Sequence, residues 1–263
     1  MAAPAHEPRL SRIAALMADA TRARMLSYLL GGELASAGEL ARCAAVGAAT
    51  ASAHLAKLLD AGLVACEPRG RHRYYRIADA EVAHALEALA LVAERASHAQ
   101  AWARPARARL REARCCYGHL AGRAGVALLA HLQGQGWLLA TDGPAGPGFA
   151  LSAEGARGLA GWGLDGEAWR TRLASAGPRR PAYPCLDWSE RRDHLAGALA
   201  SALLDHFVAR GWLRRQAGER ALQLTPTGRQ ALAWWPAADN PTDTSADTSA
   251  DTSAHTSAIT PPG

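Results

Sequence analysis

The chain has 263 residues, a formal net charge of +5 and five cysteines, with no CxxC pair among them. This length suits two domains. The chain contains neither an unbroken apolar run of about 18 residues nor a basic-then-apolar leader, which argues against a membrane or secreted protein. We therefore expect a cytoplasmic protein with reduced thiols.

Residues 1–9 are expected to be a flexible N-terminus. Within the stretch 46–76, a helix is predicted that ends at Gly62. Leu55, Leu58 and Leu59 share one face of this helix, and Gly62 suits its C-terminal end. The other faces carry small polar and cationic side chains. Those expected to face DNA are Thr50, Ser52, His54 and Lys57.

A basic hairpin is predicted directly after this helix. Residues 63–65 begin one strand, Pro68 and Gly70 mark a turn, and residues 74–77 form a β-prone return strand. Four arginines and a histidine lie on or near the tip, a density typical of phosphate and minor-groove contacts. The residues expected to touch DNA there are Arg69, Arg71, His72 and Arg73; Arg76 is the fourth arginine.

The chain resembles the ArsR family of winged helix-turn-helix repressors over about residues 10–98, in the segments RIAALMADATRARMLSYLL (12–30), GELARCAAV (38–46) and ATASAHLAKLLDAGLV (49–64). The resemblance implies that 12–30 form the first two helices, with Asp19 and Thr21 at the break and cap. It also implies that 38–46 are the first helix of the helix-turn-helix, and that Thr50, Ser52 and His54 face DNA.

Another helix is predicted over residues 79–98, capped by Asp79 and carrying an apolar stripe that includes Val82, Leu86 and Leu89. In the resembled family this helix pairs with the first helix of a second subunit. The resemblance therefore implies a homodimer that binds double-stranded DNA at a roughly palindromic operator.

Two metal sites of the resembled family are not reproduced in this sequence. Ser36 and Gly38 stand where the family's paired thiols would fall on the third helix. On the last helix of the DNA-binding domain, the residue types suit a second family site but the spacing departs from its pattern. Those residues are Glu81, His84, Glu94 and His98.

The second half contains an internal repeat. HLAGRAGVALLAHLQGQGWL (119–138) matches HLAGALASALLDHFVARGWL (194–213), and the match resumes between 149–162 and 222–235. Each copy predicts a long helix, two strands and a capped helix, with Ser152 and Thr225 as the N-caps. We expect the copies to pack about a pseudo-twofold axis.

The expected fold is mainly α with small β-wings, an α+β class. Residues 10–103 are expected to form a winged-helix DNA-binding and dimerisation domain. Residues 104–236 are expected to form a duplicated effector-sensing domain of two winged-helix-like half repeats, at about 115–165 and 185–236. The arginine-rich stretch 104–114 reads as a solvated helix face or as a basic linker. The DTSA-rich tail, 237–263, is expected to be disordered.

Thiols and imidazoles that precede or begin the two copies suggest an effector site. Because pseudo-twofold packing can bring equivalent ends together, they could bind a metal or metalloid ion or act as a redox sensor. The alternative is a set of ordinary buried thiols, with histidines capping helices. The candidate residues are Cys115, Cys116, Cys185, Asp187, His119 and His194.

Three tryptophans lack repeat partners and are candidates to line an apolar or aromatic ligand pocket, for example for an organic inducer: Trp169, Trp188 and Trp234. Trp137 with Trp212, and Trp162 with Trp235, are repeat partners and are expected in the core.

These features predict a sequence-specific transcriptional regulator, a repressor released when a small effector binds the second domain. The alternatives are an effector-independent architectural DNA-binding protein and an enzyme targeted by its winged helix. No GxGxxG after a strand, GxSxG, HExxH or P-loop motif occurs, so we expect no enzymatic activity and no catalytic residues.

Overall fold

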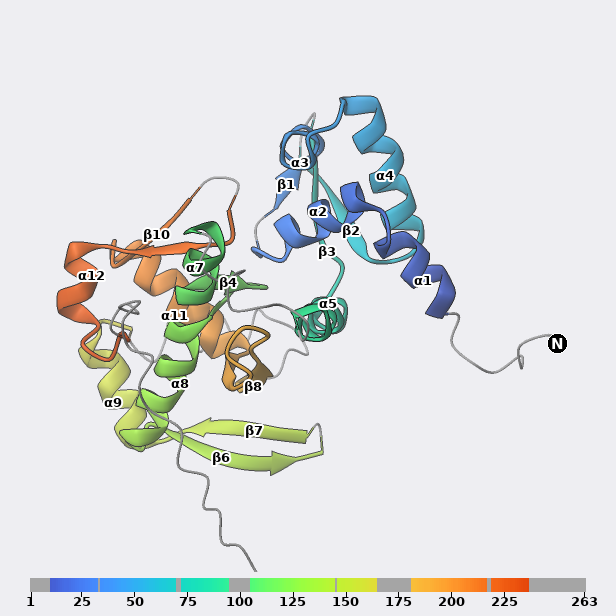
Figure 1. The fold of residues 1–263 in the computed structure, drawn as a ribbon. Coiled ribbons are helices and arrows are strands. Elements are labelled where there is room, and N and C mark those ends of the chain that lie inside the picture. Colours follow the sequence, from blue (N-terminus) through green and yellow to red (C-terminus); the bar gives the residue numbers. More distant parts are fainter. Residues whose placement is uncertain are drawn as a thin grey trace, which may run out of the picture.

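The computed structural model describes residues 10–32, 34–69, 72–94, 105–144, 146–164, 181–216 and 219–236. The expected flexible N-terminus and the DTSA-rich tail lie outside these residues. Two groups of elements are visible, one formed by the first half of the chain and one by the second (Figure 1). In the described part, no helix has the length and apolar character that a bilayer span requires.

The first half is a winged helix-turn-helix, as the sequence predicts. A three-stranded antiparallel sheet, in the order β1-β3-β2, pairs the wing strands from Val64↔Ile77 to Arg69↔His72. Its elements are α1 (Leu10–Met17), α2 (Ala20–Leu29), β1 (Ala35–Ser36), α3 (Ala37–Ala44), α4 (Ala48–Asp60), β2 (Val64–Arg69), β3 (His72–Ile77) and α5 (Ala80–Ala93).

Local signals in the sequence fix the ends of these helices. The Asp19 carboxylate accepts a hydrogen bond from the Arg22 amide and caps α2, and Asp79 caps α5 in the same way. Ser36 and Glu39 form a reciprocal capping box at the start of α3. Gly62, with φ of +69°, follows the end of α4. The caps thus fix where α2, α3 and α5 begin, and Gly62 marks the end of the DNA-facing helix α4.

The second half contains the same order of elements twice, a hairpin, a long helix, a second hairpin and a short helix. Only the part from the long helix onward was expected from the repeat; the leading hairpins have strands too short to show a sequence period. The first set is β4 (Arg114–Cys116), β5 (His119–Ala121), α8 (Arg123–Gly134), β6 (Leu138–Gly143), β7 (Gly146–Leu151) and α9 (Ala153–Gly161). The second is β8 (Tyr183–Leu186), β9 (Asp193–Ala196), α11 (Ala198–Ala209), β10 (Leu213–Arg215), β11 (Leu222–Leu224) and α12 (Pro226–Ala231).

Repeat partners adopt the same local conformations. Gly122 and Gly197, at the N-caps of α8 and α11, have φ of +79° and +96°. A Cβ on Gly122 would lie 2.5 Å from the Arg111 carbonyl oxygen, so this position requires glycine for space as well as for φ. Ser152 and Thr225 cap α9 and α12, as the sequence predicts.

Both copies contribute to one hydrophobic core. Leu128, Leu129 and Leu132 of α8 belong to the same buried cluster as Leu203 and Phe207 of α11. Trp212 is buried in it, and the other repeat-matched tryptophans, Trp137, Trp162 and Trp235, pack against it partly buried. The two copies therefore stabilise each other through shared burial of apolar surface.

Helix α7 (Pro105–Glu112) carries the arginine-rich stretch, and its arginines form ion pairs with acidic residues of the same chain. Arg109 pairs with Glu219 at 3.5 Å and Arg111 with Glu190 at 2.9 Å, while Arg107 pairs with Glu94 at the end of α5. The stretch is thus a helix with intramolecular ion pairs, which differs from a basic linker.

Candidate functional site

The helix-turn-helix presents one polar face of α4 to solvent. Ala51, Leu55 and Leu58 are buried against the helices below, which leaves Thr50, Ser52 and Lys57 exposed. Short hydroxyl side chains and one cation on an exposed helix suit contacts with base edges and phosphates in a major groove. Three of the four residues expected on this helix are therefore accessible to DNA.

His54 differs from that expectation. Its Nδ1 lies 3.2 Å from Nη1 of Arg22 and 3.6 Å from a carboxylate oxygen of Asp19, and its side chain is only 16% exposed. The reason is helical phase, because His54 stands three residues after Ala51 and four before Leu58, at the edge of the buried face. We correct its role from DNA contact to positioning of α4 against α2.

The wing carries exposed cations at its tip. The side chain of Arg69 is 61% exposed, and His72 and Arg73 are also exposed. Arg71 lies outside the described residues. Arg76, in contrast, is at the base of the wing, where its Nε donates to Glu67 Oε1 at 2.7 Å and its guanidinium holds the pKa of Glu67 below its usual range. Arg76 therefore supports the hairpin.

A groove separates α4 from the wing. It has a volume of about 540 Å³ and is lined by residues of both elements, including Ser52, Ala56, His72 and Arg73, together with Ser36 at the start of α3. Polar groups of the helix and cations of the wing thus face one shared concave surface.

A second site lies in the other half, at the two leading hairpins. In β4–β5, Cys116 stands opposite His119, and in β8–β9, Cys185 stands opposite His194. Directly opposed residues of an antiparallel pair project to the same face. Each hairpin therefore presents one thiol and one imidazole side by side.

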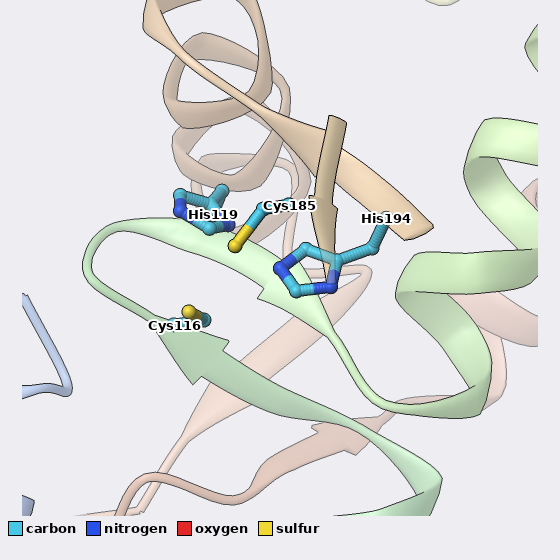
Figure 2. A group of neighbouring side chains, drawn as sticks. All are labelled: Cys116, His119, Cys185 and His194. Carbon is cyan, nitrogen blue, oxygen red and sulfur yellow. The ribbon is translucent and has the colours of Figure 1, made fainter. Parts of the chain in front are cut away.

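Packing of β5 against β9 brings the two pairs together (Figure 2). One potential ligand atom from each of the four side chains lies within 4.8 Å of the others. The imidazole ring centroids of His119 and His194 are 5.1 Å apart. All four residues are at most 5% exposed. We call Cys116, His119, Cys185 and His194 the Cys–His cluster.

Cys115 is not part of the cluster. Successive side chains of a strand point to opposite faces, so Cys115 and Cys116 diverge. Cys115 is 1% exposed and belongs to the main apolar core of this half. The expectation that both thiols share one site is wrong for this residue, because the short strand β4 was not predicted and its alternation was unknown.

Asp187 lies behind the cluster and organises it. One carboxylate oxygen accepts hydrogen bonds from the Gly122 amide at 2.7 Å and from Arg114 at 2.9 Å, and it lies 3.3 Å from His194 Nδ1. The other accepts from Ser189. Asp187 thus orients His194 from outside, although the sequence placed it within the site.

Burial and mutual proximity perturb the protonation of the cluster. Burial, together with the neighbouring His194, lowers the pKa of His119 to about 3. Burial also tends to lower the pKa of His194, but interactions with the Asp187 carboxylate and the Cys185 thiol outweigh it and raise this pKa to about 9. Interactions with the Cys116 thiol and with the imidazoles of His194 and His84 lower the pKa of Cys185. These shifts arise from the burial of the groups and from their contacts with one another and with Asp187.

Helix α5 connects this site to the first half. His84 of α5 is within hydrogen-bonding reach of the Cys185 thiol, an interaction that raises the pKa of His84. Three residues further on, Glu87 is 2% exposed and accepts a hydrogen bond from Arg220. Arg114 lies 3.8 Å from the same carboxylate. The sequence analysis did not predict these contacts between α5 and the second half. Glu87, an acidic residue beside Leu86 on the apolar side of α5, could have indicated them.

Trp188 does not line a ligand pocket, although the sequence led us to expect it. Trp188 is 8% exposed, and the Arg114 guanidinium stacks over its ring at 4.4 Å from the centroid. The indole therefore packs against a buried cation, which corrects the view of Trp188 as a pocket wall. Trp169 lies outside the described residues.

Comparison with known proteins gives matches to both halves. Residues 17–67 match the family described as a helix-turn-helix domain. The HTH-type transcriptional regulator YdfF of Bacillus subtilis is 38% identical over 224 residues, which are 85% of this chain and 95% of YdfF. This match extends well beyond the helix-turn-helix.

Two solved structures match a smaller part of the chain. One is the homodimeric winged helix-turn-helix DNA-binding domain of Mb0332 from Mycobacterium bovis, a possible ArsR-family regulator. It is 27% identical over 36% of this chain and 98% of its own, with a TM-score of 0.31. The cadmium metal-sensor CMTR from Mycobacterium tuberculosis is 35% identical over 30% of this chain and 81% of its own, with a TM-score of 0.27.

Proposed function

The chain belongs to the HTH-type transcriptional regulators, and from this premise we propose that it is a homodimeric repressor of the ArsR type, released from its operator by a small effector. The effector acts through residues 105–236, and no catalytic step is part of the proposal. The carrying observation is the groove between α4 and the wing, which both elements line with groups suited to DNA.

In this proposal α4 recognises the DNA sequence, and the wing supplies affinity for DNA. Thr50 and Ser52 are exposed hydroxyl groups on a helix that can enter a major groove, where such groups hydrogen-bond to base edges. Arg69 and Arg73 contact phosphates or the adjacent minor groove, and these contacts supply affinity that depends on salt. The two elements together favour specific over general binding of DNA.

Dimerisation is assigned to α5. Its inner side buries Ala83, Leu86 and Glu87, while Leu89 is 47% exposed and Val92 is 53% exposed. With the exposed Ala85 and Ala88, these two residues form an apolar stripe at helical spacing. A second copy of the chain covers this stripe in the proposal. Two wings in such a dimer require a roughly palindromic operator.

Effector release is assigned to the contact between the halves. A ligand changes operator affinity only to the extent that it prefers one arrangement of the dimer. A 100-fold release therefore requires about 2.7 kcal/mol of differential binding. The interactions of Glu87 and His84 with the second half are the described contacts through which α5 can be moved.

The test is fluorescence anisotropy with duplex DNA from upstream of the protein's own gene and a scrambled duplex of equal composition. Wild type should prefer the upstream duplex, and the double variant Thr50→Ala, Ser52→Ala should lose about 10-fold or more of that preference, since a base contact contributes about 1–3 kcal/mol of discrimination. Thr227→Ala, an exposed hydroxyl on α12, is the control. Equal affinity of wild type for both duplexes contradicts sequence-specific regulation.

The effector part has its own assay. Adding the low-molecular-mass fraction of a cell extract should lower the affinity of wild type for the upstream duplex. Unchanged affinity with every fraction contradicts release by a small effector and leaves DNA binding unaffected.

A further inference from the structure

Two hairpins that are far apart in the sequence deliver the same pair of side chains to one point. Each hairpin holds one cross-strand pair, Cys116 with His119 and Cys185 with His194. The side chains of the two pairs lie together inside the second half. Nothing in the packing of an apolar core requires four side chains of this chemistry to converge. Two thiols and two imidazoles are the ligand set of a tetrahedral zinc site.

We propose that the Cys–His cluster binds one Zn²⁺ ion through the two sulfurs and one ring nitrogen of each histidine, and that the ion holds the two leading hairpins together. The site lies outside the DNA-binding half. It does not depend on the proposed function, because an ion that fastens two hairpins is useful whatever the second half does.

The spacing of the ligand atoms fits this ion. Zinc bonds of about 2.3 Å to sulfur and 2.0 Å to nitrogen place tetrahedral ligand atoms roughly 3.3–3.8 Å apart. The four potential ligand atoms are already within 4.8 Å of one another. Small rotations of side chains on two packed hairpins are enough to close the remaining difference.

Unpartnered nitrogens point to a missing ligand. Within the described residues, His119 Nδ1 and His194 Nε2 are buried without a hydrogen-bond partner, and His194 Nδ1 has only the Asp187 carboxylate, at 3.3 Å. A buried polar atom left without a partner destabilises the folded protein. Coordination satisfies such nitrogens, whereas a disulfide between Cys116 and Cys185 would leave both imidazoles as they are.

Asp187 completes the arrangement as an outer carboxylate. Its Oδ2 lies 3.3 Å from His194 Nδ1, which leaves Nε2 of that ring for the ion. A carboxylate behind a ligating histidine fixes the ring and increases its basicity. Arg114 and the Gly122 amide hold Asp187 itself in place.

The experiment uses full-length protein purified under reductant without an affinity tag that binds metal. Elemental analysis should find one zinc per chain. Replacement by Co²⁺ should give the visible bands of tetrahedral cobalt and a near-ultraviolet charge-transfer band with the intensity of two thiolates. This wild-type measurement needs no variant, so it remains decisive if ligand variants do not fold.

The variants identify the thiols. Cys116→Ser and Cys185→Ser should each lower zinc affinity by more than about 100-fold, the upper end of losses seen when only an outer partner is removed. Cys115→Ser and Cys43→Ser are matched controls, since neither thiol is in the cluster, and they should keep the affinity within a few fold.

Three results overturn the proposal. One is reduced wild-type protein that binds neither zinc nor cobalt. Another is a charge-transfer band that persists unchanged in both Cys116→Ser and Cys185→Ser. The third is a Cys116–Cys185 disulfide as the native form, with no metal taken up after reduction.

Discussion

The guanidinium of Arg220, just before β11, donates a hydrogen bond to the carboxylate of Glu87 in the middle of α5. This is a buried ion pair between the two halves of the chain, with side chains 13% and 3% exposed. Arg114, fully buried, approaches the same carboxylate at 3.8 Å. One acid of the first half thus meets two arginines of the second.

Replacing Glu87 by alanine should destabilise the protein by about 3–5 kcal/mol, because it leaves Arg220 and Arg114 buried without this partner. Chemical denaturation followed by circular dichroism measures the change. Glu154→Ala removes an exposed partner of Arg157 and should cost about 0–1 kcal/mol. Equal losses for the two variants would refute the coupling of the halves through Glu87.

Replacing Arg69 and Arg73 together by alanine should weaken DNA binding at all sequences. Each lost phosphate contact should reduce the slope of log K against log salt by about 0.9. Binding titrations at several salt concentrations measure the slope. Arg109→Ala with Arg157→Ala removes the same charge from helices of the second half, and an equal change of slope in that control would exclude a specific role of the wing.

Placing a charge on the exposed stripe of α5, as in Leu89→Glu with Val92→Glu, should convert a dimer to a monomer. The reason is the high cost of burying an unpaired carboxylate in an apolar interface. Sedimentation velocity gives the association state. Leu139→Glu, on a residue of β6 that is 53% exposed, should leave that state unchanged; dissociation by Leu139→Glu alone would assign the interface elsewhere.

Replacing His54 by alanine should lower stability by about 0.5–1.5 kcal/mol, the usual contribution of one hydrogen bond, since it removes the contact with Arg22. Ser52→Ala on the exposed face should change stability by less than about 0.5 kcal/mol. Thermal unfolding in the absence of DNA compares them. A larger loss of stability for Ser52→Ala than for His54→Ala would contradict the assignment of His54 to packing and of Ser52 to DNA contact.

Local signals made most of the first half predictable from sequence. Asp79 was identified as a capping residue, Gly62 as the end of the DNA-facing helix, and the hairpin after it as a wing. The resemblance placed the break and cap before the second helix at Asp19 and Thr21, and the structure shows that Asp19 is the N-cap. These features depend on neighbours a few residues away, where periodicity and capping chemistry decide the structure. His54 was misplaced because it stands at the edge of the buried face, where a small rotation of the helix changes the environment.

The second half was predictable only where the repeat is long. The helices and their caps at Ser152 and Thr225 followed from the matched segments. The leading hairpins did not, because strands of three or four residues give no usable alternation, so Cys115 could not be told from Cys116. Contacts such as that of Glu87 with Arg220 join residues more than a hundred positions apart, and no local pattern encodes them.

The turn between Cys116 and His119 consists of Tyr117 and Gly118, both at positive φ, as a two-residue type I′ turn requires. The Tyr117 amide donates to the Leu30 carbonyl at 2.7 Å, and a Cβ on Gly32 would lie only 2.6 Å from the Gly118 nitrogen. These two contacts join the hairpin that carries Cys116 and His119 directly to the C-terminal end of α2. Because α2 packs on α4, a single helix lies between this hairpin and the DNA-facing helix.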